Sequence, residues 1–186
     1  MPLADVFSLL VLGQGKSGLD VARWALAHPE RVSATTVYGG GTSEPNDATR
    51  ALEAQGACAA DTVLVGFWCD KGACTPSVAA LLSALHGKRV FLFGTCGFGA
   101  DQSYYQQIID RVTSNLAGDA ELAGWAMCQG KMGPAVKQRY EAMLEQDPEN
   151  ARFKMLLDNW VAAKDHPTKE DLDNMAAAAK KAVLGE

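Results

Sequence analysis

Short apolar runs alternate along the chain with longer amphipathic stretches. Several of these runs are continuous or rich in β-branched residues, which is typical of strands buried on both faces. They predict strands at residues 6–12, 31–38, 62–67, 89–93 and, more weakly, 121–127. The amphipathic stretches predict helices at residues 19–27, 47–55, 76–85, 101–115, 134–145, 151–163 and 169–184.

Boundary residues support several of these helices. Thr75 and Pro76 suit the N-cap and first position of one helix, and Gly87 suits its end. Thr168, followed three residues later by Asp171, resembles a capping box at the start of the last helix. These signals place helices between and after the strands.

Strands that alternate with helices indicate an α/β fold with a doubly wound parallel sheet covered on both faces. The pattern predicts five strands in three layers. We expect residues 1–148 to form the sheet domain, and residues 149–186 to form a helical extension packed on the same domain.

Composition narrows the function classes. A chain of 186 residues with 48% hydrophobic and 21% charged residues suits one soluble domain. The net charge of −5 argues against nucleic acid as a partner. The five cysteines are scattered, which favours a reducing, cytoplasmic setting over a disulfide framework. No secretory signal or membrane-length apolar run is evident, so we expect no membrane partner.

Ligands of open parallel sheets bind beyond the carboxyl ends of the strands, so the loops there are informative. The first has glycines, a lysine and a hydroxyl, which suit a phosphate at a helix N-terminus. Its residues are Gly13, Gln14, Gly15, Lys16, Ser17 and Gly18. The alternative is a tight turn without a ligand. The Walker A phosphate-binding pattern is incomplete, because Leu10 stands where its first glycine belongs. The dinucleotide-binding pattern is also incomplete, because the second strand does not end in an acidic residue that could bind a ribose.

Two further loops combine aromatic residues with glycines. The loop after the third strand contains Trp68, Cys69, Asp70 and Gly72. The loop after the fourth contains Thr95, Cys96, Gly97 and Phe98. Trp68 suits stacking on a planar cofactor or, equally, packing beneath a helix. Phe98 suits a flat ligand or an exposed position in a flexible loop.

The cysteines and histidines give little support for a metal site or a nucleophile. Cys69 and Cys74 have the spacing CxxxxC with no histidine nearby, and a CxxC motif is absent. Cys69 or Cys96 as a nucleophile would need a general base, and none is suggested. We interpret them as small core or loop residues.

Four segments stand out along the chain: GFWCDKG (66–72), LHGKRVFLFGTCG (85–97), CQGK (128–131) and HPTKEDL (166–172). In sequence and in order they resemble motifs of the flavodoxin-domain proteins, some of which accompany bilirubin-reducing enzymes in gut bacteria (the BilS-type flavodoxins). The resemblance runs from about residue 63 to the C-terminus. It implies a flavodoxin-like three-layer α/β/α fold with flavin mononucleotide (FMN) at the strand ends.

The resemblance also assigns roles. Residues 68–72 would flank one face of the flavin ring, and residues 95–99 the other face or edge. The Gly72 peptide would respond to protonation of the flavin N5, and Lys131 would offset flavin or partner charge. One departure stands out: flavodoxins use a Ser/Thr-rich phosphate loop, whereas residues 12–18 read LGQGKSG. Weak FMN binding, loss of FMN or another aromatic ligand therefore stay open.

The leading hypothesis is an FMN-binding electron-transfer protein that passes electrons between a reductase and an acceptor enzyme, with no catalytic side chain. The first alternative is an FMN-dependent NAD(P)H reductase acting on a quinone or a tetrapyrrole. The second is a cofactor-free accessory subunit. A third is a nucleotide-binding protein that uses Gly15, Lys16 and Ser17.

Overall fold

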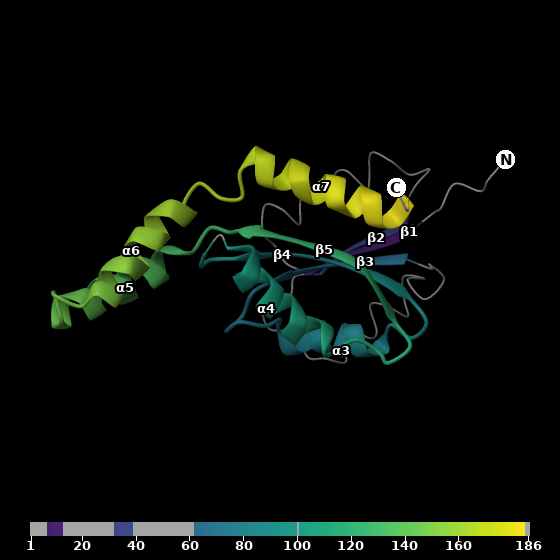
Figure 1. Cartoon of the computed structure of the whole chain (residues 1–186), viewed down its shortest axis with the longest axis horizontal. Helices are drawn as coiled ribbons and strands as arrows, with labels where there is room; N and C mark the ends of the chain where they lie inside the picture. Colours follow the sequence, from purple (N-terminus) through teal and green to yellow (C-terminus); the bar gives the residue numbers. More distant parts are fainter. Residues whose placement is uncertain (1–6, 13–31, 39–61, 100, 185–186) are drawn as a thin grey trace.

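A central parallel sheet organises the chain (Figure 1). The computed structural model describes residues 7–12, 32–38, 62–99 and 101–184. The strands lie in the order β2-β1-β3-β4-β5, and every neighbouring pair is parallel. Their bounds are β1 Phe7–Leu12, β2 Val32–Tyr38, β3 Thr62–Trp68, β4 Arg89–Cys96 and β5 Glu121–Gln129.

In the described part of the chain, two helices cover one face of the sheet. Helix α3 (Pro76–Ala84) and helix α4 (Gln102–Thr113) pack on β3 and β4. Branched residues of the helices meet branched residues of the strands in one core, which includes Val63, Val65, Leu81, Leu82, Val90, Leu92, Ile108 and Ile109. All eight are fully buried, so this core is the main source of hydrophobic stabilisation among the described residues.

Helix α7 (Lys169–Leu184) covers the opposite face (Figure 1). Met175 and three alanines of this helix pack on Leu64, Phe91, Phe93 and Cys128. The alanines let the helix approach the two phenylalanine rings closely. The described helices therefore lie on both faces of a parallel sheet, which confirms the α/β fold expected from the sequence.

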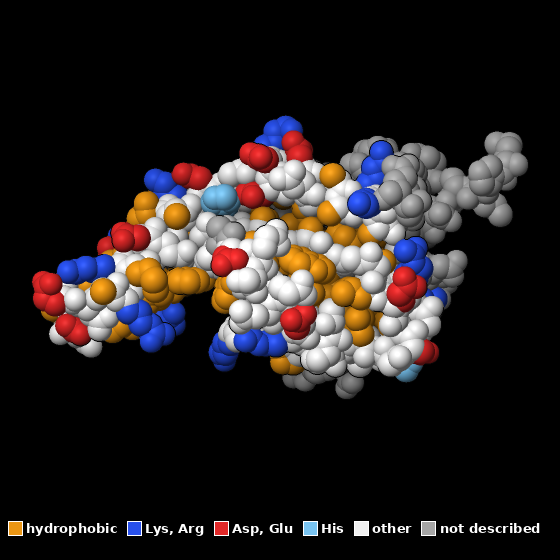
Figure 2. Space-filling view, in the orientation of Figure 1, with side chains coloured by type: hydrophobic (Ala, Val, Ile, Leu, Met, Phe, Trp, Pro, Cys, Tyr) orange, Lys and Arg blue, Asp and Glu red, His pale blue; other side chains and the backbone are white. Residues whose placement is uncertain are grey.

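Helices α5 (Pro134–Gln146) and α6 (Ala151–Ala163) form a hairpin that projects beyond the sheet (Figure 1). The outline of the molecule narrows where this hairpin joins the sheet (Figure 2). The chain then returns along the sheet through α7. Helix α6 thus pairs with α5 across the boundary expected at residues 148 and 149.

Three strands extend further than the sequence analysis predicts. β3 reaches Trp68, β4 reaches Cys96 and β5 reaches Gln129. The prediction ended β4 at Phe93 because Gly94 follows, and that was wrong. Gly94 pairs with Phe67 on one side and Met127 on the other, so its backbone remains in the ladder. A Cβ at Gly94 would lie 2.9 Å from the Phe67 carbonyl oxygen, so the glycine permits this close pairing.

The helix boundaries largely follow the predicted signals. Thr75 is the N-cap of α3 and Pro76 begins it, but the Thr75 hydroxyl makes no capping bond. That helix ends at Ala84, before the predicted residue 85. The helices predicted at residues 19–27 and 47–55 lie outside the described residues. Among the helices that the structure describes, none is both long and apolar enough to cross a bilayer.

Candidate functional site at the strand tips

The strand order creates one natural place for a ligand. From β1 the chain crosses to β2 on one side and later to β3 on the other, so the direction of winding reverses between β1 and β3. Ligands of open α/β sheets bind beyond the carboxyl ends of the strands at such a point. All five strand ends at this edge are described, but of the loops that follow them the structure describes those after β3, β4 and β5.

Trp68 is the last residue of β3 and pairs with Thr95 of β4. The sequence analysis placed both residues in loops, and that was wrong, because the β3–β4 ladder continues to the Cys69 N–H, which donates to the Thr95 carbonyl (2.8 Å). Phe67 packs in the α3–α4 core, so the alternation of a strand places Trp68 on the opposite face. Its half-buried ring is held by regular sheet pairing rather than by a loop.

The chain reverses immediately after Cys69 in a tight turn over residues 70–73. Asp70 and Ala73 exchange two backbone hydrogen bonds, of 2.8 and 3.0 Å. Lys71 (φ 50°) and Gly72 (φ 85°) both adopt positive φ, as in type I′ turns. Arg111 of α4 donates from Nη1 to the Gly72 carbonyl (3.0 Å). The turn is therefore fastened to α4.

Three polar side chains hold the backbone of the loop that follows β4. Asn159 of α6 donates from Nδ2 to the Gly97 carbonyl (2.9 Å) and accepts from the Gly99 N–H (3.3 Å). Gln129 at the end of β5 donates to Asn159 Oδ1 (3.1 Å). The Tyr105 hydroxyl donates to the Gly99 carbonyl (2.9 Å). This loop is thus tied to α4, β5 and the projecting hairpin at once.

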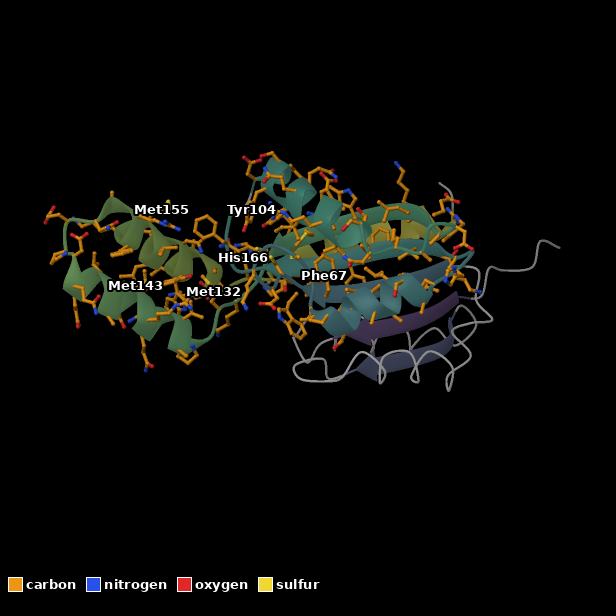
Figure 3. The ribbon with its side chains drawn as sticks, turned by 90° about the horizontal axis from the view of Figure 1, so that it is seen from below. Phe67, Tyr104, Met132, Met143, Met155 and His166 are labelled. Atoms are coloured by element: carbon orange, nitrogen blue, oxygen red, sulfur yellow. The ribbon has the colours of Figure 1, made fainter. Side chains whose placement is uncertain are left out.

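Apolar contacts complete the same loop. Phe98 is half-buried against the α3–α4 core, and its ring meets Tyr104 edge-on with centroids 6.2 Å apart. Met132 lies over Gly97, where a Cβ would come within 2.6 Å of Met132 Cγ. Figure 3 shows Tyr104 and Phe67 at the end of the sheet that faces the hairpin, with Met132 at the junction. Phe98 is therefore packed, in contrast to a flexible loop with an exposed ring.

The structure brings together two cysteines that the sequence analysis treated separately. Cys69 and Cys96 share a side-chain hydrogen bond on the α3–α4 face. This bond, with further bonds from the Phe98 N–H and the Tyr104 hydroxyl, outweighs burial and lowers the pKa of Cys96. The same shared bond, followed by burial, raises the pKa of Cys69. Of the two sulfurs, Cys96 is therefore the one that ionises more readily.

The pKa values of the other two described cysteines are shifted mainly by burial, not by a second thiol. Burial raises the pKa of Cys128 to about 12, and Cys128 lies on the α7 face among phenylalanine rings. Burial also raises the pKa of Cys74. All four described cysteines are free thiols. Cys74 and Cys128 match the expected role of small packing residues.

Several residues at this edge escaped the sequence analysis. Three side chains reach the loops from helices: Arg111, Asn159 and Tyr105. The contact of Arg111 spans 39 positions and the two contacts of Asn159 span 60 and 62, whereas that of Tyr105 spans six. Gln129 is signalled only by its place in the CQGK motif. Asn159 has one weak signal, because it is a neutral amide in a mainly apolar helix (ARFKMLLDNWVAA).

The predicted phosphate loop (Gly13, Gln14, Gly15, Lys16, Ser17 and Gly18) lies outside the described residues. The remaining predicted site residues gather at one edge: Trp68, Cys69, Asp70 and Gly72 from β3 and its turn, and Thr95, Cys96, Gly97 and Phe98 from β4 and its loop. Half-buried Trp68 and Phe98 approach this edge from opposite faces of the sheet. Aromatic surfaces beside tight, fastened turns fit a flat heteroaromatic ligand such as a flavin ring.

Comparison with known proteins gives a consistent family. Residues 44–180 match the Flavodoxin_3 model, described as a flavodoxin domain. The chain is 41% identical over 119 residues to the flavodoxin-like domain-containing protein BilS of Clostridium symbiosum (strain WAL-14163), covering 61% of this chain and 62% of that protein. That match spans less than two thirds of the relative's length. This chain is also 32% identical over 124 residues to the BilS protein of Clostridioides difficile (strain CD3), and that match covers 67% of this chain and 70% of the relative.

A solved structure with similar chain path is an NADH:FMN oxidoreductase (EMOB) in its apo form. It shares 15% identity, covers 87% of this chain and 92% of its own, and gives a TM-score of 0.45. The sequence matches carry the assignment. On their evidence, the chain belongs to the flavodoxin-domain family, together with the BilS proteins.

Proposed function

We propose that this protein binds FMN at the strand tips and passes electrons between a reductase and an acceptor enzyme. Membership of the flavodoxin-domain family supports the proposal. The observation that carries it is the placement of Trp68 and Phe98 on opposite faces of one sheet edge, beside two fastened turns. Bound flavin would supply one- and two-electron transfer.

In this proposal the chain's own residues bind and orient the ring. Trp68 and Phe98 would contact its two faces, and the 70–73 turn would present backbone groups to its edge. Arg111 fixes that turn through the Gly72 carbonyl. Asn159, Gln129 and Tyr105 fix the loop that carries Phe98. A preorganised frame lowers the entropic cost of binding.

In this proposal, residues 13–18 bind the phosphate of FMN. Their glycines would allow backbone amides to approach the anion, and Lys16 would add a positive charge. The loop has one hydroxyl, so we expect its affinity to depend on Lys16 strongly. Lys16→Ala should weaken binding of FMN more than binding of riboflavin, which lacks the phosphate.

Partner docking would use complementary charge. The net charge of −5 favours encounter with basic redox partners, and such steering weakens as salt rises. We therefore expect the rate of electron transfer to a basic partner to fall between low and physiological ionic strength. Cytochrome c, a basic one-electron acceptor, is a suitable probe. A rate that is independent of salt would argue against electrostatic docking.

The direct experiment is an absorption spectrum of the purified protein before and after addition of FMN, followed by gel filtration to remove free flavin. We expect the flavin bands to remain with the protein. Adding NADH or NADPH without a partner should then leave the bands unchanged for a carrier. Bleaching by NAD(P)H alone would instead indicate a reductase. A protein that stays colourless would indicate a cofactor-free accessory subunit.

A further inference from the structure

Two thiols occupy matching positions at the ends of β3 and β4. The register pairs Trp68 with Thr95, so the next positions along it are Cys69 and Cys96. The Cys69 N–H still donates to the Thr95 carbonyl, so the two backbones remain at ladder distance there. Neighbouring strands lie about 4.8 Å apart, and disulfides span Cα separations of about 4.4–6.8 Å. The pair is therefore placed for a direct S–S bond.

The surroundings of the two sulfurs differ. Cys96 accepts hydrogen bonds from the Cys69 thiol, the Phe98 N–H and the Tyr104 hydroxyl. Asp70 beside Cys69 disfavours a negative charge on that sulfur. The titratable groups beside the pair are Asp70 from the turn after β3, and Tyr104 and Tyr105 from α4. Arg111 of α4 interacts with Tyr104. Ionisation of the pair therefore favours Cys96 as the thiolate, with Cys69 still protonated beside it.

Access to the pair is also uneven. Cys96 is only 4% exposed, whereas Cys69 is half-buried. A bulky disulfide oxidant would reach Cys96 poorly, but a hydroperoxide as small as hydrogen peroxide needs little space. A thiolate held by donated hydrogen bonds beside a second thiol is the arrangement of a reactive cysteine with its resolving partner.

We propose that Cys69 and Cys96 form a reversible dithiol–disulfide site that small hydroperoxides oxidise. The Cys96 sulfur attacks one oxygen of ROOH, the O–O bond breaks, and ROH leaves after taking a proton from water. The Cys69 sulfur then attacks the Cys96 sulfenic acid, the S–O bond breaks, and water leaves with the Cys69 proton. Two thiols are oxidised and one peroxide is reduced. A dithiol reductant reverses the bond by thiol–disulfide exchange.

The bond would have a structural consequence. It would join the end of β3, just before the 70–73 turn, to the end of β4, just before the loop that carries Phe98. Oxidation would therefore fix the spacing of the two segments that shape the candidate site. The proposal does not depend on FMN, because the oxidant is the peroxide and both sulfurs belong to the chain.

The test treats reduced full-length protein with one equivalent of hydrogen peroxide, blocks the remaining thiols with N-ethylmaleimide and maps the peptides by mass spectrometry. We expect a Cys69–Cys96 linked peptide that dithiothreitol removes. The peptide map also covers Cys58, which lies outside the described residues. In Cys69→Ser we expect no link, and dimedone should trap a sulfenic acid at Cys96.

Cys128→Ser is the matched control, because Cys128 is buried near the end of the neighbouring strand β5, on the opposite face of the sheet. It should form the Cys69–Cys96 link as readily as the wild type. The rate of wild-type alkylation at Cys96 should show a lower apparent pKa than that of an unfolded cysteine, and Cys69→Ser should raise it. A link from Cys69 to Cys74, or oxidation of Cys58 and Cys74 while Cys69 and Cys96 remain thiols, would overturn the proposal.

Discussion

Gly72 illustrates how one residue determines the shape of the candidate site. Its φ of 85° lies in the left-handed region, and a Cβ there would come within 2.9 Å of Arg111 Nη1. Gly72→Ala should therefore lose about 1–2 kcal/mol of stability from backbone strain alone. Displacement of Arg111 should add to that loss. Urea unfolding measures it.

Gly133→Ala is the matched control for that change. Gly133 precedes α5 with a φ of −68°, and a Cβ there meets nothing within 4 Å. Its effect on the free energy of unfolding should stay within about 0.5 kcal/mol. Equal losses in both variants would mean that the strained turn is not the cause.

Asn159 acts at the same scale through its amide group. Removing that group in Asn159→Ala leaves the buried Gln129 side chain and the Gly97 carbonyl with fewer partners. We expect a loss of about 1–3 kcal/mol, the cost of unsatisfied buried polar groups. Faster amide exchange at Gly99 should accompany it, since Gly99 loses its acceptor.

Asn174→Ala provides the comparison for Asn159, because Asn174 is exposed on α7. It should leave both stability and Gly99 exchange near the wild-type values. If Asn159→Ala behaves like Asn174→Ala, the hairpin does not hold the loop.

At the scale of an element, α7 depends on its first turn. The Asp171 carboxylate accepts from the Thr168 N–H (2.7 Å), the Thr168 hydroxyl (2.8 Å) and His166 Nδ1 (2.6 Å), and the Asp171 N–H donates to Thr168 Oγ1 (3.1 Å). This reciprocal pattern confirms the capping box predicted from the sequence. Burial opposes ionisation, but the bonds from Thr168 and His166 outweigh it and lower the pKa of Asp171.

Because the pKa of Asp171 is lowered in the folded state, the contribution of this residue to stability decreases in acid. The unfolded carboxyl titrates near 3.8, so the stabilisation from Asp171 is complete above that pH. It is lost as the pH falls through the lower folded value. The stability difference between wild type and Asp171→Asn should therefore be constant from about pH 5 to 6 and shrink below about pH 4. Thermal unfolding across pH measures it, and a difference that grows in acid would contradict the capping role.

Most elements could be predicted from the sequence because their signals are local. The apolar runs of β3 and β4 and the capping box of α7 are contained in a few adjacent residues. The strand ends were harder, since Gly94 and Thr95 owe their extended state to neighbours on both sides. The contacts of Arg111 and Asn159 with the loops depend on packing between distant segments. No local pattern carries that information.

At the scale of the whole molecule, the hairpin is the least expected feature. The sequence analysis found both of its helices, but their hydrophobic patterns do not indicate that they pack mainly on each other. Met155 remains 48% exposed on α6 and Val161 54%. Figure 2 shows hydrophobic side chains on this hairpin beside charged ones. Through Asn159 the hairpin nevertheless reaches the loop beside the candidate site.

A comparison of Trp68, at the sheet edge, with Trp160, on the hairpin, tests whether a tryptophan binds the ligand or only packs. Trp68 ends β3 at the candidate site, whereas Trp160 lies on α6 and donates from Nε1 to the Gly133 carbonyl (3.3 Å). Trp68→Ala should weaken FMN binding by about 5- to 150-fold, because base–aromatic stacking of this kind contributes about 1–3 kcal/mol. Trp160→Ala should leave the affinity within about twofold.

Titration of FMN into the purified wild-type protein, followed by calorimetry and by the flavin spectrum, tests the account most directly. The account predicts saturable binding at one site, perturbed flavin bands and a marked loss of affinity in Trp68→Ala but not in Trp160→Ala. Absence of heat and of any spectral change in the folded wild-type protein would contradict flavin binding, while leaving the parallel α/β fold in place.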